Sequence, residues 1–84
     1  MIEPTGGWTE DLGDTWTLTI PGKPGRPDLL LRVFPDPTHT SEPWTWEVVA
    51  LEDDAEREVE VGGAISREAA MAVAVARATA YELE

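Results

Sequence analysis

Alternation of apolar and polar residues predicts β-strands through most of the chain. The clearest run is 15–20, where Trp16, Leu18 and Ile20 alternate with three threonines. A period of two places successive side chains on opposite faces of a strand, and threonine suits the solvent-facing side. We therefore expect a half-buried strand at 15–20, and a short edge strand at 8–10.

The next run, residues 28–34, follows a loop rich in Pro and Gly and also alternates. The charge of Arg32 predicts that its face is exposed, and that face also holds Leu30 and Phe34. The inward positions are Leu29, Leu31 and Val33. Exposed apolar residues on a sheet can mark a contact site, or a loop can cover them.

Two more strands are predicted at 44–52 and 57–61, separated by an acidic turn. In the first, the inward positions are Trp44, Trp46, Val48 and Ala50. In the second, the inward positions are Val59 and Val61, and the outward positions are Glu58 and Glu60. We expect Gly62 and Gly63 to end the sheet, because glycine weakens strands.

Residues 66–83 predict a helix, because they hold seven alanines and neither Gly nor Pro. Ser66 is a good N-cap, and Glu68 in the first turn complements the helix dipole. The face expected on the sheet is Ala69, Ala72, Val73, Ala76, Ala80 and Leu83. A second apolar stripe, Met71, Val75 and Ala78, is expected to lie deep in a groove or to meet another chain.

Consecutive strands joined by short loops favour an antiparallel meander. The sequence thus predicts a single α+β domain with a three- to four-stranded antiparallel meander sheet and one C-terminal helix packed on one face. We expect a flexible arm at 1–7, the sheet over 8–61 and the helix over 66–83.

The chain is strongly acidic, with 17 Asp and Glu against 6 Lys and Arg and a formal net charge of −11. The excess lies in residues 1–65, which hold 14 acidic and 4 basic residues. Direct binding to nucleic acid is disfavoured, because phosphates require Lys and Arg. A basic protein surface would be attracted, although high charge also serves solubility.

The sequence gives little sign of secretion, of a membrane span or of catalysis. It contains no cysteine, no long apolar run and no signal peptide, and this pattern is typical of a cytoplasmic protein. His39 lies near Asp36, Ser41 and Glu42, but in a Pro-rich loop that lacks an oxyanion turn. We expect neither an enzyme nor a cofactor.

Metal binding is also not expected. The acidic residues Glu52, Asp53, Asp54 and Glu56 form a cluster, but it lacks the spacing and the central glycine of an EF-hand. Acidic hairpin turns are usually only solvated.

Glu56, Glu58 and Glu60 repeat at every second position, about 6.5–7 Å apart on an extended strand. Phosphates along a nucleic acid strand have a similar spacing, so this row could imitate a phosphate backbone. Glu47, Asp53 and Asp54 would extend it. The alternative is an ordinary charged face that discourages aggregation between sheet edges.

Trp44, Trp46 and Val48 at alternate positions, then Gly63 to Ser66, then Glu68 to Ala70 opening an Ala-rich helix form a pattern over about residues 44–80. This pattern resembles small acidic phage and prophage α+β proteins, including anti-CRISPR proteins. The resemblance implies a non-enzymatic inhibitor that blocks a nucleic-acid-binding complex of the bacterial host cytoplasm. It transfers no site residues.

The leading hypothesis is therefore an acidic protein-binding module whose partner has a basic surface. Besides the carboxylates, we expect apolar contacts from Leu30, Phe34, Met71 and Val75. One alternative is a homo-oligomeric accessory protein that dimerises through the Met71 and Val75 stripe. The last is a small enzyme that uses His39.

Overall fold

The computed structural model describes residues 7–38, 40–53 and 55–82. The strands are β1 (Thr9–Asp11), β2 (Thr15–Ile20), β3 (Asp28–Pro35), β4 (Trp44–Glu52) and β5 (Ala55–Ala64), and the helix is α1 (Arg67–Glu82). A short 3₁₀ turn, Leu12–Asp14, joins β1 to β2.

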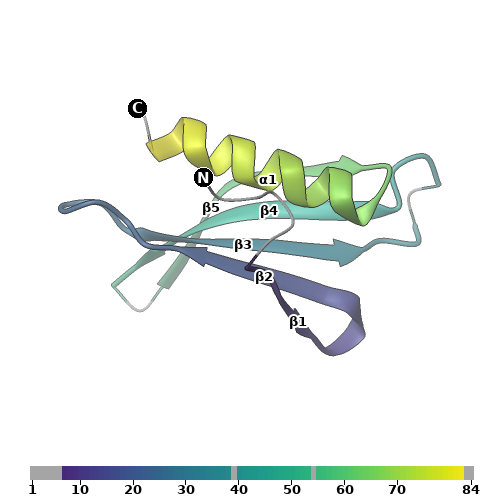
Figure 1. Ribbon diagram of the computed structural model, residues 1–84, viewed down its shortest axis with the longest axis horizontal. Helices are drawn as coiled ribbons and strands as arrows, with labels where there is room; N and C mark the ends of the chain where they lie inside the picture. Colours follow the sequence, from purple (N-terminus) through teal and green to yellow (C-terminus); the bar gives the residue numbers. More distant parts are fainter. Residues whose placement is uncertain (1–6, 39, 54, 83–84) are drawn as a thin grey trace.

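Each strand pairs antiparallel with the next, in the order β1-β2-β3-β4-β5. The helix lies across one face of the sheet, over β3 and β4 (Figure 1). The α+β class and the antiparallel meander with one C-terminal helix are confirmed. The sheet has five strands rather than three or four, because the short segment β1 pairs with β2, with Thr9 opposite Thr17.

The core lies between the helix and the middle of the sheet. Leu29, Leu31 and Val33 of β3 are fully buried, and Val48 and Ala50 of β4 lie beside them. These are the inward positions that the alternation predicts. Burial of each large aliphatic side chain contributes about 1.5–3 kcal/mol, so the two central strands supply much of the stability.

All four tryptophans belong to this core or pack against it. Trp46 is 6% exposed and lies opposite Gly62 of β5. A β-carbon added at Gly62 would lie 2.6 Å from atom Cζ2 of the Trp46 indole. Gly62 and Gly63 lie within β5 and do not end the sheet, and at Gly62 the indole fills the space that glycine leaves.

The helix begins where the sequence predicts. The Ser66 hydroxyl accepts a hydrogen bond from the Ala69 amide at 3.1 Å, and the Ser66 carbonyl accepts one from the Ala70 amide at 2.9 Å. Ser66 is thus the N-cap, and it satisfies an amide that the first turn leaves without a helical partner.

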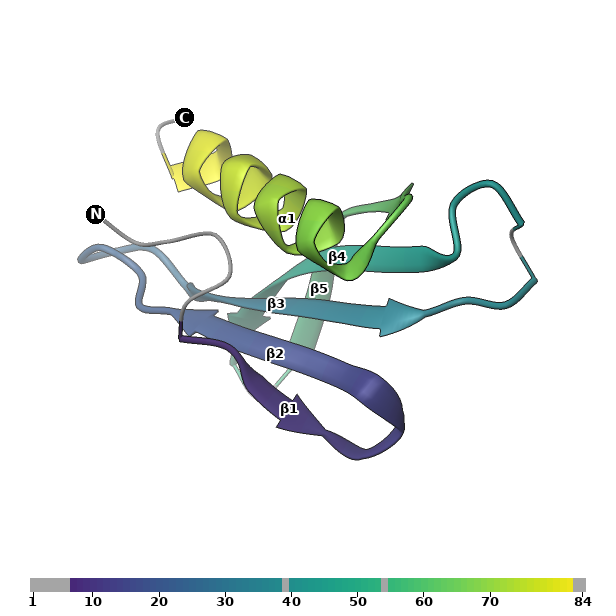
Figure 2. The same ribbon diagram turned by 45° about the vertical axis from the view of Figure 1, so that its right-hand side comes forward.

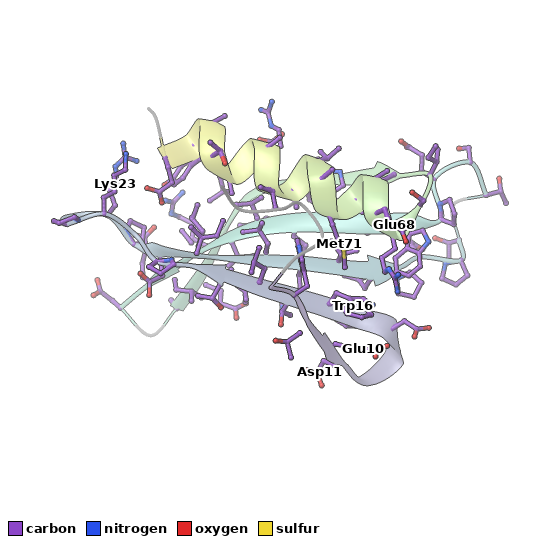
Figure 3. The ribbon with its side chains drawn as sticks, in the orientation of Figure 1. Glu10, Asp11, Trp16, Lys23, Glu68 and Met71 are labelled. Carbon is purple, nitrogen blue, oxygen red and sulfur yellow. The ribbon has the colours of Figure 1, made fainter. Side chains whose placement is uncertain are left out.

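The helix presents the opposite face to the sheet from the one expected. Its buried residues are Ala70, Met71, Ala74 and Ala78, with Val75 and Tyr81 partly buried against the core. Val73 is exposed, and Figure 3 shows Met71 pointing toward the sheet. The sheet-facing position expected for Val73 is therefore wrong, and of the two alternatives for the Met71 stripe the buried one holds, because burying Met71 and Tyr81 removes more apolar surface from water than burying alanines.

A β-bulge in β5 changes which of its side chains point to each face of the sheet. Glu58 pairs with Val49 and Glu60 pairs with Val48, so Val59 has no partner of its own in β4. Beyond the bulge the alternation is inverted. Val61 is 51% exposed, whereas Glu60 lies on the helix side, so the predicted inward position of Val61 and outward position of Glu60 are wrong.

Some predicted features lie outside the described residues. These are His39, Asp54, Leu83 and nearly all of the predicted arm at 1–7.

Candidate protein-binding face of the sheet

The face of the sheet opposite α1, called here the outer face, is formed by alternate residues of every strand. Strand register sets two central rows across it. One row runs Thr17, Arg32, Glu47 and Val61, and the other runs Thr19, Leu30, Val49 and Glu58. Figure 2 shows the helix on one side of the sheet, and no other helix or strand of the described chain covers the outer face.

An ion-pair network lies at the centre of the outer face. Arg32 Nε lies 2.7 Å from Glu47 Oε1, and Arg32 Nη2 lies 3.2 Å from Glu56 Oε1. The three side chains come from β3, β4 and β5. Each is partly exposed, so solvent screens the network, and exposed pairs of this kind contribute about 0–1 kcal/mol.

Apolar side chains surround these charges. Leu30, Phe34 and Leu51 are half-buried, and Val49 is only 2% exposed although it lies on the outer face. Val61 continues the apolar area to the edge of the sheet. The outer face is therefore amphipathic, with carboxylates set among partly covered aliphatic and aromatic groups.

The structure brings together only part of the predicted site. Glu47, Glu56 and Glu58 share the outer face with Leu30 and Phe34. Asp53 lies in the exposed turn between β4 and β5, where it adopts a positive φ of 43°.

Glu60, Met71 and Val75 lie on the helix side of the sheet and do not belong to this face. Glu60 pairs with Arg77 of α1 at 2.8 Å, between its Oε2 and the arginine Nε. The predicted row of three glutamates is therefore reduced to Glu56 and Glu58, because the bulge turns Glu60 to the other face.

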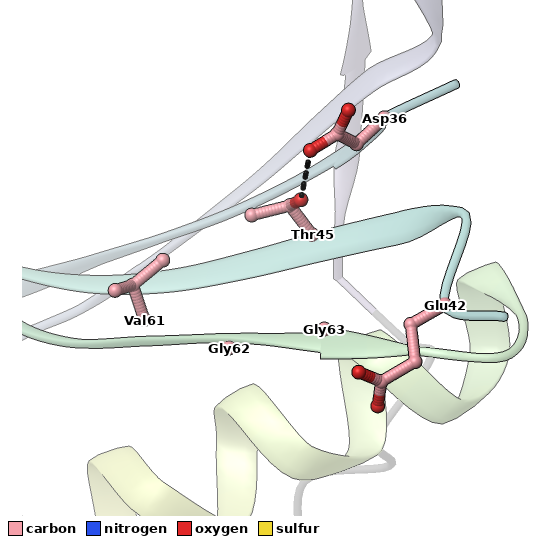
Figure 4. A pocket seen from close by; sticks show the side chains of 6 residues that line it. All are labelled: Asp36, Glu42, Thr45, Val61, Gly62 and Gly63. Atoms are coloured by element: carbon pink, nitrogen blue, oxygen red, sulfur yellow. Dashed lines mark hydrogen bonds between the residues drawn. The ribbon is translucent and has the colours of Figure 1, made fainter. Parts of the chain in front are cut away.

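One end of the outer face is hollowed. A cavity of about 330 Å³ is lined by Asp36, Glu42, Thr45, Val61, Gly62 and Gly63 (Figure 4). Asp36 Oδ2 lies 3.5 Å from the Thr45 hydroxyl, and its Oδ1 accepts a 2.6 Å hydrogen bond from the Thr38 hydroxyl. Two carboxylates thus flank a floor made of glycine backbone.

The sequence does not predict this hollow. In the sequence, Asp36 and Glu42 stand out only as neighbours of His39, and the two glycines stand out as the expected end of the sheet. A Gly-Gly pair after an alternating run can also indicate a close approach to the backbone, and that signal was present.

On the helix side, a second hollow of about 320 Å³ separates β5 from the end of α1. There Arg57 donates hydrogen bonds to Glu52 at 2.6 Å and to the Tyr81 hydroxyl at 3.0 Å. The Glu52 carboxylate, followed by the Tyr81 hydroxyl, raises the pKa of the Arg57 guanidinium above its usual value. Its hydrogen bonds to Glu52 and Tyr81 connect the end of the helix to the sheet.

In residues 7–38, 40–53 and 55–82, no group of three or more His, Asp or Glu side chains is placed to hold a metal ion. No helix in the same part of the chain has the length and apolar character needed to cross a bilayer.

Comparison with known proteins identifies no related protein. No family model matches the sequence, and neither the curated proteins nor the solved structures give a significant match.

Proposed function

We propose that the protein is a non-enzymatic binding module whose outer face docks onto a basic surface of another protein. The observation that supports this most directly is the one-sided cover of the sheet. The helix buries one face, while the other presents Glu47, Glu56 and Glu58 beside Leu30 and Phe34.

The net charge of the molecule indicates that the surface of the expected partner is positively charged. With a net charge of −11, the molecule attracts basic surfaces and repels phosphates at long range. Apolar groups next to the carboxylates add contact area that charge alone does not provide. A nucleic-acid-binding complex of a bacterial cell has such a surface, and occupancy by this protein would exclude the nucleic acid.

Dimerisation through the helix is not part of the proposal. Met71 is 3% exposed and Val75 packs against the core, so their stripe is not available to a second chain.

The test uses the double variant Glu56→Lys with Glu58→Lys. The wild-type protein, immobilised, should retain nucleic-acid-binding proteins from a bacterial lysate at low salt and release them when DNA or RNA is added. The double variant should retain at least about tenfold less, and its retention should depend less steeply on salt, because rim charges mainly set attraction and its screening.

The double variant Glu10→Lys with Glu68→Lys is the matched control. Glu10 is exposed on the edge strand β1, opposite Trp16, and Glu68 is exposed in the first turn of α1, so both lie away from the carboxylates of the outer face. This variant makes the same charge change and should retain the same proteins. Equal loss in the control and in Glu56→Lys/Glu58→Lys would show that only total charge matters. Full retention by Glu56→Lys/Glu58→Lys would refute docking through the outer face.

A further inference from the structure

The sheet has two edges, and they differ in how well they are protected. Strand β1 has three residues, two of which are Glu10 and Asp11 (Figure 3). Strand β5 has ten residues, and within residues 7–38, 40–53 and 55–82 it pairs only with β4. An edge strand leaves backbone N–H and C=O groups directed outward, and proteins usually block such edges with charges, bulges or short strands. By these criteria β1 is blocked.

Only the first part of β5 is blocked in the same way. Residues 55–60 contain three glutamates and Arg57, and the bulge at Val59 interrupts the regular pairing there. Residues 61–64, Val-Gly-Gly-Ala, carry no charge, no proline and no bulge. The end of β5 is therefore an edge that none of these devices protects.

Exposed apolar side chains gather at the same end. In the described residues, the large hydrophobic side chains that are exposed are Val61 at 51%, Ile65 at 75% and Val73 at 38%. Two of these three lie within or directly after the unprotected part of β5. Exposure of this kind is unfavourable in the isolated molecule and favours contact with a partner.

The acidic hollow opens beside this edge. Gly63 lies on the outer face opposite Thr45 and lines the hollow together with Asp36. The Glu42 side chain lies over Gly63, with its Cβ and Oε1 3.0 and 3.1 Å from the place a Gly63 β-carbon would occupy. A strand added next to β5 would lie about 4.8 Å away, so one of its side chains could reach the exposed Glu42 carboxylate over Gly63 and extend toward Asp36.

We infer that residues 61–64 of β5 accept an extended basic segment of another protein as a sixth strand, with a lysine or arginine side chain in the hollow between Asp36 and Glu42. The backbone of the edge would supply affinity, and the hollow would select the cation. The basic character of the partner rests on the proposed function, whereas pairing at this edge does not.

A second copy of the chain fits the edge less well than a basic segment. Each copy carries a net charge of −11, so two copies repel each other on approach.

The probe is a synthetic peptide of about six residues, the usual length of a strand, that alternates lysine with valine. Its counterpart has glutamate in place of lysine. Amide hydrogen exchange of the full protein is followed by NMR with each peptide. The lysine peptide should slow exchange at residues 61–64 by about tenfold or more, and the glutamate peptide should not.

Two variants at one position provide the matched comparison. Val61 is exposed on the outer face beside the hollow, so Val61→Lys and Val61→Glu both lose the same apolar group and should both fold. Val61→Lys should abolish protection by the lysine peptide. Val61→Glu should keep it, because the added carboxylate attracts the peptide.

Three results would overturn the inference. They are equal protection by both peptides, protection at β1 instead of β5, and sedimentation that shows edge-paired dimers of the protein itself.

The Glu56→Lys/Glu58→Lys variant separates the two proposals. If it loses the lysate proteins while the lysine peptide leaves residues 61–64 of the wild-type protein unprotected, the outer face binds and the edge does not. If it keeps the lysate proteins while the lysine peptide protects residues 61–64, the edge binds and the outer face does not.

Discussion

Val59 is the residue at which the side-chain pattern of β5 changes. Up to Glu58 the strand alternates as its sequence predicts, and after Val59 each side chain lies on the opposite face from the one expected. One extra residue in a strand is enough for this, because the side-chain period of a strand is two. The bulge thus moves Glu60 into an ion pair with the helix and leaves Val61 exposed.

Gly62 is a second single residue that shapes β5, because it contacts the Trp46 indole. Its missing side chain leaves room for the Trp46 indole against β5, and Trp46 is the one aromatic residue of the described chain that is buried, at 6% exposed. The bulge has no strong local signature, and the Gly-Gly pair indicates a close approach without showing which side chain makes it. Alternation indicates a strand, but it cannot show where the partner strand has one residue fewer.

Gly62→Ala should therefore destabilise the protein by about 1–3 kcal/mol, the usual cost of overpacking a filled site. Gly63→Ala is the control, since the atoms nearest its β-carbon belong to the exposed side chain of Glu42, which can move, so the variant should cost less than about 1 kcal/mol. Urea unfolding followed by tryptophan fluorescence measures both. Equal effects would mean that the indole does not lie on Gly62.

At the scale of elements, the helix shows how apolar surface area selects a face. An alanine-rich helix has nearly the same hydrophobicity all round, so a helical wheel alone does not identify the buried side. Met71 and Tyr81 decide it, because they carry the largest apolar surfaces. The row Ala70, Ala74 and Ala78 then lets the helix lie close to the sheet, while the alanines on the solvent side contribute helix propensity.

Met71→Ala should lower the free energy of unfolding by about 2–5 kcal/mol, because it removes a buried side chain and leaves a cavity. Val73→Ala, on the exposed side of the same helix, should change it by about 0.5 kcal/mol or less. Chemical denaturation monitored by circular dichroism compares the two. A larger loss for Val73→Ala would support the helix orientation that the sequence pattern first favoured.

At the scale of the whole molecule, the arginines make ion pairs and ring contacts within the chain. Arg32, Arg57 and Arg77 form ion pairs across elements. Arg26 and Arg67 lie over the rings of Tyr81 and Trp16, at 5.8 and 4.8 Å from the ring centroids. Because 17 acidic residues face only six basic ones, most of the negative charge is not neutralised by these contacts.

Mutual repulsion should therefore make stability depend on salt. Raising sodium chloride from about 0.01 M to about 0.15 M shortens the screening length from about 30 Å to about 8 Å, so repulsion across the molecule weakens. We expect the melting temperature to rise by a few degrees, with a smaller rise for Glu58→Gln, which removes one of the repelling charges. Thermal melts by circular dichroism measure this. A melting temperature that falls with salt would mean that the ion pairs outweigh the repulsion.

Local chemistry in the sequence determined the elements of this protein. Alternation placed β2, β3 and β4, the Ser66 cap began the helix, and the inward residues of β3 formed the core as predicted. Tertiary structure decided the phase of β5 beyond Val59, the face that the helix buries and the hollow over Gly63. These depend on how residues distant in sequence compete for the same buried space, and a local pattern contains no information about that competition.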